Sequence, residues 1–415
     1  MKTAILTVGT EILFGQIVNT NAAFLSQQLN NLGYDVMYHY TVGDNPGRLA
    51  ELIHLAFRDC DLILTTGGLG PTQDDLTKET IAKAMGDVVV ENPACMKYLK
   101  ENYERAGRKM TPNNLKQAYM PSRATVLPND AGTAPGFALE QDGKIIIAMP
   151  GPPREMQRMF ELQVKPLLQK KQDSVIYYRM LRMFGIGESS LETVLLPLID
   201  GQTDPTLATY AKEGECSLRI ASKRATEEEA RAAVDEMTEK VRSLVGEYIY
   251  SYDDEDLIDV VGRLLLEKKI TIACAESCTG GLFAGALTDT PGISEVFGYG
   301  YVTYSCEAKE TELGVKPETI ETYGVVSPQV AEEMAAGLAA KTGAKLCISV
   351  TGLAGPDGGS AEKPVGLAYI GVSYEGRLYA VKSYYRNVSR KWNRHYTLLR
   401  MLFEVYRLIS PEKPA

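Results

Sequence analysis

The stretch DLILTTGGLGPTQDD, residues 61–75, decides the fold of the first part of the chain. It begins as a short apolar run, ends in closely spaced glycines, and is followed by helical periodicity over residues 76–85. A similar apolar run and amphipathic stretch precede it at residues 2–8 and 21–32. Strands that alternate with helices predict a parallel sheet with helices on its faces, and such sheets bind ligands at the carboxyl ends of their strands.

The last part of the chain repeats this alternation after a smaller module. The module is expected to contain strands at residues 175–184 and 216–222 and helices at residues 188–199 and 226–245. The elements expected in the last part are residues 270–275, 281–287, 330–341, 345–350, 367–372, 378–384 and 397–409. We therefore predict an α/β protein with a doubly wound first domain (1–168) and a second α/β domain (256–411), joined by a small α+β module (174–250).

The composition excludes several classes of protein. Of the 415 residues, 45% are hydrophobic and 23% are charged, which is typical of a globular protein. No stretch reaches the roughly 18 apolar residues that a membrane span needs. The net charge of −9, without a long basic run, argues against an extended nucleic-acid surface. Seven cysteines without C-x-x-C spacing and three distant histidines indicate neither a disulfide framework nor a metal cluster, and they fit a reducing cytoplasm.

Three polar loops follow apolar runs in the last region. They are AESCTGG at 275–281, VTYSCEAK at 302–309 and TGLAGPDGG at 351–359. A serine at a strand-to-helix turn is exposed at the sheet edge, close to helix amides that can stabilise an oxyanion, and glycine N–H groups can hold a phosphate. Each loop also has a structural alternative, with Ser277 as a helix cap, Lys309 as a surface charge and the glycines as a long turn. Together the residues predict a site for a phosphate-bearing small molecule, with Ser277 as a candidate nucleophile.

These loops, with GVVS at 324–327, resemble the nicotinamide mononucleotide amidase domain of the CinA family. The resemblance implies a dyad of Ser277 and Lys309, with Tyr304 as a further catalytic position, and it implies no cofactor. A lysine can serve as the base once burial makes it neutral. Cys278 is the alternative nucleophile, because a thiol needs less activation. The implied substrate-binding residues are Thr279, Gly280, Thr351, Gly352, Gly355, Gly358 and Arg390.

The sequence departs from the family pattern near the terminal helix. The usual pattern has Gly-x-Arg and a second arginine four residues later, whereas this chain reads NVSRKWNR at 387–394. Arg390 and Arg394 keep the spacing, but the glycine is missing. We assign Arg390 to the substrate phosphate.

The first region resembles the molybdopterin-binding-like domain of the same family. The motifs that carry this resemblance are GTEIL at 9–13, GQIVNTN at 15–21, GGLGPTQDD at 67–75, GTAPG at 132–136 and MPGPP at 149–153. The resemblance implies an ADP-ribose pyrophosphatase. Asp74 and Asp75 suit a divalent metal ion, with Glu11 as a further ligand or ribose contact, and helix capping is the alternative role of the two aspartates. The implied substrate-binding residues are Gly67, Gly68, Gly70 and Asn19.

The middle module resembles the family's KH-type domain. It lacks a Gly-x-x-Gly clamp, so direct nucleic-acid binding does not follow.

We expect a bifunctional hydrolase of pyridine-nucleotide salvage that acts on nicotinamide mononucleotide and ADP-ribose, as a cytoplasmic homodimer without membrane contact. Two alternatives stay open. One is a regulatory protein of DNA uptake and recombination with a recombinase as partner, and the other is a pterin-binding N-terminal domain that serves cofactor assembly.

Overall fold

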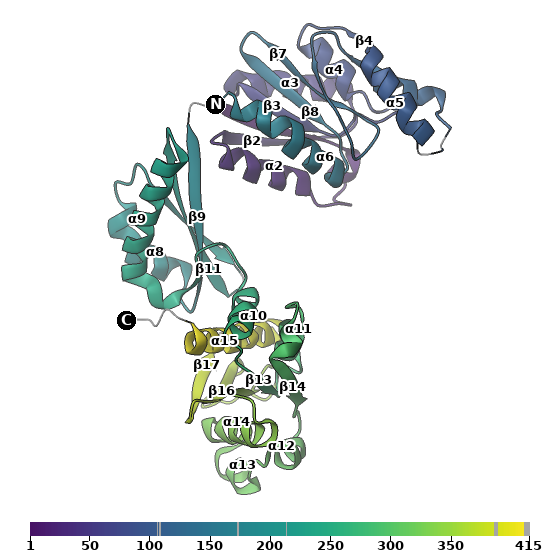
Figure 1. Ribbon diagram of the computed structural model, residues 1–415. Coiled ribbons are helices and arrows are strands. Elements are labelled where there is room, and N and C mark those ends of the chain that lie inside the picture. Colours follow the sequence, from purple (N-terminus) through teal and green to yellow (C-terminus); the bar gives the residue numbers. More distant parts are fainter. Residues whose placement is uncertain (106, 108, 172–173, 213, 386–388, 411–415) are drawn as a thin grey trace. The chain divides into compact units, whose positions relative to one another are not determined.

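The computed structural model describes residues 1–415 apart from residues 106, 108, 172–173, 213, 386–388 and 411–415 (Figure 1). Contacts within the chain divide it into two compact units. The first comprises Met1–Tyr177 with Ser222–Ala232, and the second comprises Tyr178–Ala221 with Ala233–Ala415. The protein has the α/β fold class predicted from the sequence.

The first unit contains a six-stranded sheet in the order β2-β1-β3-β8-β7-β6. Its strands are β1 (Lys2–Val8), β2 (Asp35–Val42), β3 (Leu62–Thr66), β6 (Thr125–Leu127), β7 (Gly136–Gln141) and β8 (Lys144–Met149). The four strands from β2 to β8 are parallel to their neighbours, as predicted, whereas β7 and β6 add an antiparallel edge. A separate two-stranded sheet pairs β4 (Val89–Glu91) with β5 (Tyr119–Pro121).

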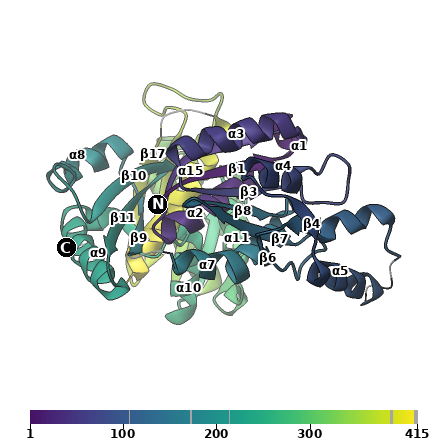
Figure 2. The same cartoon turned by 90° about the horizontal axis from the view of Figure 1, so that it is seen from above.

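Helices cover both faces of this sheet. On one face, α2 (Thr20–Asn31) and α6 (Pro153–Met159) share an apolar cluster with Ile5 of β1. On the other face, α3 (Pro46–Asp59) and α4 (Thr77–Ala84) pack against the residues that alternate with Ile5 in β1, and Figure 2 shows α3 along the sheet. Side chains of a strand point alternately to the two faces, so this apolar strand requires cover on both. The remaining helices are α1 (Thr10–Leu13), α5 (Pro93–Arg105), η1 (Pro112–Ala118), η2 (Phe160–Val164) and α7 (Lys165–Gln169).

The middle module has a four-stranded sheet in the order β10-β11-β9-β12 with two helices. Its elements are β9 (Val175–Phe184), α8 (Glu188–Ile199), β10 (Thr206–Lys212), β11 (Glu215–Arg224), α9 (Glu227–Val245), η3 (Gly246–Tyr248) and β12 (Ile249–Ser251). Strand β10 was not predicted, because its burial pattern is mostly exposed and only Leu207 is deeply buried in it.

The last domain has a five-stranded sheet in the order β14-β13-β15-β16-β17. Its strands are β13 (Ile272–Glu276), β14 (Phe297–Val302), β15 (Leu346–Gly352), β16 (Leu367–Tyr374) and β17 (Arg377–Tyr384). The first three strands in this order are parallel, and β16 and β17 are antiparallel additions. The parallel part brings the carboxyl ends of β13, β14 and β15 to the same edge, where the three polar loops begin.

Two groups of helices cover the faces of this last sheet (Figure 1). One group comprises α10 (Leu257–Glu267), α11 (Leu282–Thr288) and α15 (Arg390–Ile409), and the other comprises α12 (Cys306–Leu313), α13 (Pro317–Tyr323) and α14 (Pro328–Thr342). Helix η4 (Ile293–Glu295) precedes β14. The terminal helix begins at Arg390 rather than at residue 397, because Ser389 accepts a hydrogen bond from the backbone N–H of Trp392 and caps a polar first turn.

The middle module and the last domain pack together within the second unit. The ring of Phe184 lies 5.4 Å from that of Tyr396 and 5.1 Å from that of Phe403, both on α15. The Arg182 guanidinium pairs with Asp254 at 2.8 Å and with Asp256 at 2.7 Å. An apolar contact and a partly buried ion-pair network therefore join β9 to the last domain.

Candidate active site

Ser277 occupies the turn between β13 and α11, where the sequence places it. Its backbone N–H donates to the carbonyl of Val350 in β15 at 3.1 Å, so the turn is tied to the centre of the sheet. The serine side chain is buried rather than exposed at the sheet edge as expected. This burial shields the hydroxyl from bulk water.

Lys309 reaches Ser277 from helix α12. The helix begins with Ser305, whose hydroxyl accepts a hydrogen bond from the N–H of Ala308 at 3.0 Å, and this cap fixes the first turn. The Lys309 side chain is 0% exposed. Its Nζ lies 3.1 Å from Ser277 Oγ, 2.7 Å from the carbonyl oxygen of Thr303 and 3.4 Å from that of Tyr304. The structure therefore brings the two proposed dyad members into direct contact.

Burial sets the protonation chemistry of Lys309. Desolvation lowers the pKa of its ammonium below the ordinary value of 10.5, while the nearby thiols of Cys306 and Cys278 act in the opposite direction with smaller effect. An ammonium in a poorly solvated environment loses its proton more readily, because the neutral amine has less hydration to lose. The site thus favours the form of lysine that can accept a proton from a serine.

The alternative nucleophile, Cys278, points into the hydrophobic core. It belongs to the cluster that packs α10, α11 and α15 on the sheet. Desolvation raises the pKa of its thiol to about 11. A thiol that stays protonated near neutral pH is a poor nucleophile, so the geometry favours Ser277 over Cys278.

Glu276, which the sequence analysis did not single out, anchors the same turn. Its carboxylate accepts hydrogen bonds from the backbone N–H groups of Gly281 at 3.0 Å, Phe283 at 3.1 Å and Ala284 at 2.9 Å. These are the first amides of α11, which were expected to be available to an oxyanion. The expectation is wrong for these three amides, because a carboxylate already occupies them.

The two arginines of α15 have different partners. Arg390 donates to the hydroxyl of Tyr304 and to the carbonyl of Gly355, each at 2.7 Å, and Tyr304 is 57% exposed. Arg394 donates to the carbonyls of Cys278 at 3.1 Å and Thr279 at 2.6 Å. Arg390 and Tyr304 thus form an accessible polar pair, whereas Arg394 holds the serine turn. The lead-in at 386–388 lies outside the described residues.

The other predicted binding residues differ in whether their polar groups are already hydrogen-bonded and in how closely they are packed. The Thr351 hydroxyl donates to the carbonyl of Val325 at 2.8 Å and is buried, so it holds the chain before α14. The Thr279 hydroxyl is buried and has no hydrogen-bond partner within the described part of the chain. A Cβ at Gly352 would lie 2.7 Å from Ala368 Cβ, so this glycine permits close strand packing. Gly280, Gly355 and Gly358 all have positive φ angles, which glycine adopts without strain.

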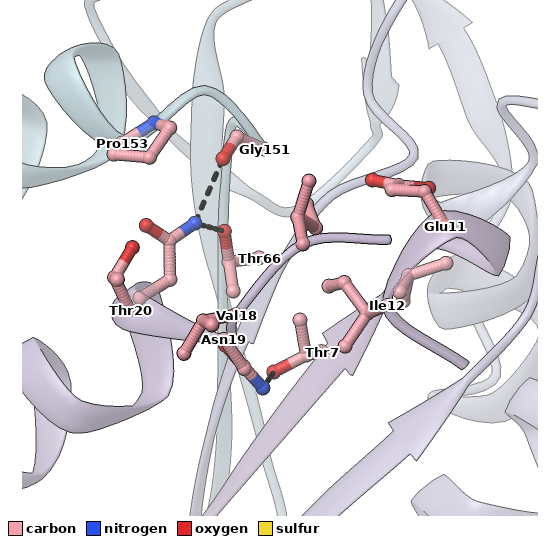
Figure 3. Close-up of a pocket in the computed structure, with 12 residues that line it drawn as sticks. Thr7, Glu11, Ile12, Val18, Asn19, Thr20, Thr66, Gly151 and Pro153 are labelled. Carbon is pink, nitrogen blue, oxygen red and sulfur yellow. Dashed lines mark hydrogen bonds between the residues drawn. The ribbon is translucent and has the colours of Figure 1, made fainter. Parts of the chain in front are cut away.

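A second candidate site lies in the first unit, at the carboxyl ends of β1 and β3 (Figure 3). It is a small pocket, and Figure 3 shows Glu11 on one side of it and Gly151 and Pro153 on the other. Its lining residues are Thr7, Val8, Glu11, Ile12, Ile17, Val18, Asn19, Thr20, Asn21, Thr66, Gly151 and Pro153. Both polar and apolar groups therefore face the pocket, as a nucleotide would require.

Two asparagines of this pocket have different tasks. Asn19 caps α2 by accepting from Ala22 N at 3.0 Å and donates to the Thr7 hydroxyl at 3.0 Å, so both ends of its amide hold the fold. The Asn21 amide nitrogen donates to Thr66 Oγ1 at 3.0 Å and to the Gly151 carbonyl at 2.7 Å. The Asn21 carbonyl oxygen is buried without a partner among the residues that the structure describes.

Comparison with known proteins shows the family. A model of the CinA C-terminal domain matches residues 254–409, one of a probable molybdopterin binding domain matches residues 4–170, and one of the damage-inducible protein CinA KH domain matches residues 178–251. A putative competence-damage inducible protein of Clostridium kluyveri is 49% identical, over 91% of this chain and 92% of that protein. The chain belongs to the CinA family.

A further relative of this CinA-family chain agrees with the assignment, and a solved structure is similar to part of the chain. A putative competence-damage inducible protein of Acetivibrio thermocellus is 49% identical over 90% of this chain and 91% of its own length. The crystal structure of CinA from Thermoplasma acidophilum, described as a protein of unknown function, is 36% identical and covers 40% of this chain and 97% of that chain, with a TM-score of 0.38.

Within the described residues, no helix combines the length and apolar character needed to cross a membrane.

The three carboxylates predicted to bind a metal ion do not form one cluster within the described residues. Over the described part of this CinA-family chain, no group of three or more His, Cys, Asp or Glu side chains is arranged to hold a metal ion. Asp75 Oδ2 instead accepts from the backbone N–H of Thr72 at 2.9 Å and from its hydroxyl at 2.5 Å. The same hydroxyl contacts Asp74 and lowers the pKa of that carboxyl. The described structure therefore does not assemble Glu11, Asp74 and Asp75 into one three-ligand group, because the aspartates fold back on their own loop, and metal binding here stays a prediction.

The glycines of the loop after β3 allow close packing, because a side chain at these positions would collide with neighbouring atoms. A Cβ at Gly67 would lie 2.0 Å from the carbonyl oxygen of Val8, and one at Gly68 would lie 2.0 Å from Thr77 Oγ1. A Cβ at Gly70 would lie 2.5 Å from Asp75 Oδ2. These three glycines, predicted to bind substrate, are absent from the lining of the pocket.

Proposed function

We propose that the C-terminal domain is a serine–lysine amidase that converts nicotinamide mononucleotide to nicotinic acid mononucleotide and ammonia. The observation that carries this proposal is the buried contact of 3.1 Å between Lys309 Nζ and Ser277 Oγ. A serine hydroxyl is a weak nucleophile and needs a neighbouring base. Burial supplies that base by favouring the neutral amine of Lys309.

The surroundings of Lys309 direct its lone pair. The carbonyl oxygens of Thr303 and Tyr304 can only accept hydrogen bonds, so they take the two N–H groups of the neutral amine. The remaining lone pair is then available to the Ser277 O–H. As Ser277 Oγ bonds to the amide carbon, its proton moves to Lys309, which passes it to the leaving nitrogen to give ammonia. Water then hydrolyses the acyl-enzyme to the carboxylic acid and restores the serine.

Arg390 supplies the charge for the phosphate of this substrate. Its guanidinium already has Tyr304 and Gly355 as partners, and an arginine can bind phosphate oxygens through several N–H groups at once. The glycine loop that begins at Gly352 adjoins this arginine through the Gly355 carbonyl. Arg390 and Tyr304 would therefore orient the nucleotide with its amide toward Ser277.

The decisive experiment measures both products of the full-length protein. Purified protein with nicotinamide mononucleotide should release ammonia and nicotinic acid mononucleotide in equal amounts. A protein that binds the nucleotide without releasing either product would contradict the proposal. That outcome would favour the alternative of a binding or regulatory protein, which the names of its relatives also suggest.

A second activity is proposed for the first unit because of its pocket. The pocket lies where a doubly wound sheet binds its ligand, and it combines the Glu11 carboxylate and the Asn21 carbonyl oxygen with apolar side chains. We propose that it binds ADP-ribose, whose hydroxyl and amino groups would donate to these acceptors, and that the diphosphate is hydrolysed there. Formation of AMP and ribose 5-phosphate from ADP-ribose tests this activity separately from ammonia release.

A further inference from the structure

Glu276 is a fully buried acidic side chain of the proposed amidase domain. It ends β13, directly before Ser277, and is 0% exposed. Taking a carboxylate out of water is costly unless hydrogen bonds replace its hydration. Here three backbone N–H groups of the chain that follows supply those bonds. Because burial of a carboxylate costs hydration free energy, its place directly beside the proposed nucleophile suggests a specific role.

The side chain of Glu276 closes the turn that carries Ser277. Oε2 accepts from Gly281 and Phe283, and Oε1 accepts from Ala284. Helix α11 has only seven residues, and its first flanking residue, Gly281, has no side chain to cap it. The Glu276 carboxylate is therefore the cap of α11, and it joins the two ends of the turn into a ring.

The backbone of Glu276 supports the other member of the dyad. Its carbonyl oxygen accepts from the N–H of Thr303 at 2.8 Å. The carbonyl of Thr303 in turn accepts from Lys309 Nζ at 2.7 Å. Glu276 thus supports both members of the pair. Its side chain holds the turn that carries Ser277, and its backbone carbonyl holds Thr303, whose own carbonyl binds Lys309 Nζ.

We propose that Glu276 is a positioning residue for the amidase reaction: its carboxylate holds Ser277 Oγ within reach of Lys309 Nζ. This role rests on the proposed function. A displacement of about 1 Å at a reacting group can cost about 10²-fold in rate. The buried carboxylate would therefore act by fixing the geometry of the pair and not by contacting the substrate.

Glu276→Gln is the direct test, because both carboxylate oxygens act as acceptors. Whichever oxygen becomes the amide nitrogen, its N–H groups then face a backbone N–H, and at least one of the three bonds is lost. The turn should loosen, and kcat for ammonia release should fall about 10- to 100-fold while KM stays within about twofold. The rising limb of the pH–rate profile should move to higher pH, since water that reaches Lys309 raises its pKa toward the ordinary value.

Glu404→Gln is the matched control, since Glu404 is also a buried carboxylate of this domain. It lies on α15 and accepts from the Tyr379 hydroxyl at 2.9 Å, remote from Ser277 in the sequence and in its contacts. This variant should keep kcat and the position of the pH limb. Equal losses of kcat in Glu276→Gln and Glu404→Gln would show that the effect comes from folding, as for any buried carboxylate of the domain. That result would overturn the proposal.

A reagent for activated serines separates this role from the choice of substrate. Labelling of full-length protein at Ser277 by a fluorophosphonate needs the dyad but no nucleotide. The labelling rate should fall about 10- to 100-fold in Glu276→Gln, and by less in Glu276→Asp, which keeps the charge on a shorter side chain. If wild-type protein is labelled but nicotinamide mononucleotide is not hydrolysed, the positioning role stands and the substrate is wrong. Equal labelling of wild type and Glu276→Gln would overturn the role, and so would absence of label from wild-type Ser277.

If Glu276→Gln does not fold, Glu276→Asp decides the question. A folded Glu276→Asp protein should show lower kcat and slower labelling with an unchanged KM. Wild-type kcat and labelling in this variant would contradict a positioning role, because the shorter side chain cannot reach all three amides without moving the turn.

Discussion

The turn after β13 and the loop after β3 follow the same sequence pattern, a buried strand that runs into glycines and polar residues, yet they use their polar groups differently. In the turn, Ser277 meets Lys309, a residue brought by another helix. In the loop, Asp74 and Asp75 are held by Thr72, a residue of the same loop. A motif therefore marks where chemistry can occur, whereas a contact with a distant element decides whether reactive groups meet.

Solvent sharpens this contrast. Lys309 is buried, and desolvation lowers its pKa, which favours the neutral amine that the proposed reaction needs. Asp74 is exposed and Asp75 is partly exposed, and Thr72 of the same loop hydrogen-bonds both, with its hydroxyl lowering the pKa of the Asp74 carboxyl. Exposed carboxylates bind a cation weakly unless several ligands converge on it. The Ser277–Lys309 pair is thus preorganised in the free protein, and the aspartates of the first unit are not preorganised in the same way.

The largest effect is expected from Ser277→Ala. Ammonia release should fall by about 10³-fold or more, because the variant has no nucleophile, while ADP-ribose hydrolysis should not change. Cys278→Ala should keep most of the activity, since its thiol faces the core. The rates of ammonia release of the two variants test this. An active Ser277→Ala together with an inactive Cys278→Ala would reverse the assignment of the nucleophile.

The next effect is that of Lys309→Arg. The guanidinium stays charged because its pKa is above about 12, so it cannot take the serine proton, and kcat should fall about 10²- to 10⁴-fold. Wild-type activity should rise with pH through the pKa of Lys309, which lies below 10.5, because the deprotonated amine is the base. Lys341→Arg, at an exposed lysine paired with Glu312, is the matched control and should keep its activity. Substantial activity in Lys309→Arg would show that the lysine acts only through its charge.

The two arginines of α15 should divide between binding and catalysis. Arg390→Ala should raise KM for nicotinamide mononucleotide by about 10- to 100-fold, the effect of losing hydrogen bonds to a charged group, with a smaller change in kcat. Arg394→Ala should mainly lower kcat, because it releases the carbonyls of Cys278 and Thr279. Steady-state kinetics of both variants measures the split. An effect of Arg390→Ala on kcat alone would remove this arginine from the phosphate.

The smallest effects are expected at Asp74 and Asp75. A chelator should leave ammonia release unchanged, and it should lower ADP-ribose hydrolysis if a metal ion bound with the substrate completes that site. Asp75→Asn should weaken this hydrolysis more than Asp74→Asn, because Asp75 holds both the hydroxyl and the N–H of Thr72. Equal chelator sensitivity of the two reactions would break the contrast between the two regions.

The sequence predicts β1, β3, β13 and β15 because their apolar runs are buried, whereas the edge strands β2 and β14, which have few buried residues, are not predicted. It misses the start of α15, since the polar first turn at Arg390 and Lys391 interrupts the apolar pattern. It also misses Glu276, whose partners lie five to eight residues further along the chain and are backbone amides, which carry no sequence signal. The contacts of Thr72 with Asp74 and Asp75 are missed for a related reason, because the sequence does not show which groups of a loop fold back on one another.

The contact of β9 with the terminal helix has a consequence for thermal unfolding. Phe184 packs against α15, and Arg182 pairs with the acidic residues before α10, so the middle module and the last domain should melt in one cooperative transition. Trp392 can report that transition, because its ring lies next to Tyr385 and close to Gly214 of the middle module. In a calorimeter, the heat absorbed by this transition should correspond to both family domains, although sequence comparison separates them.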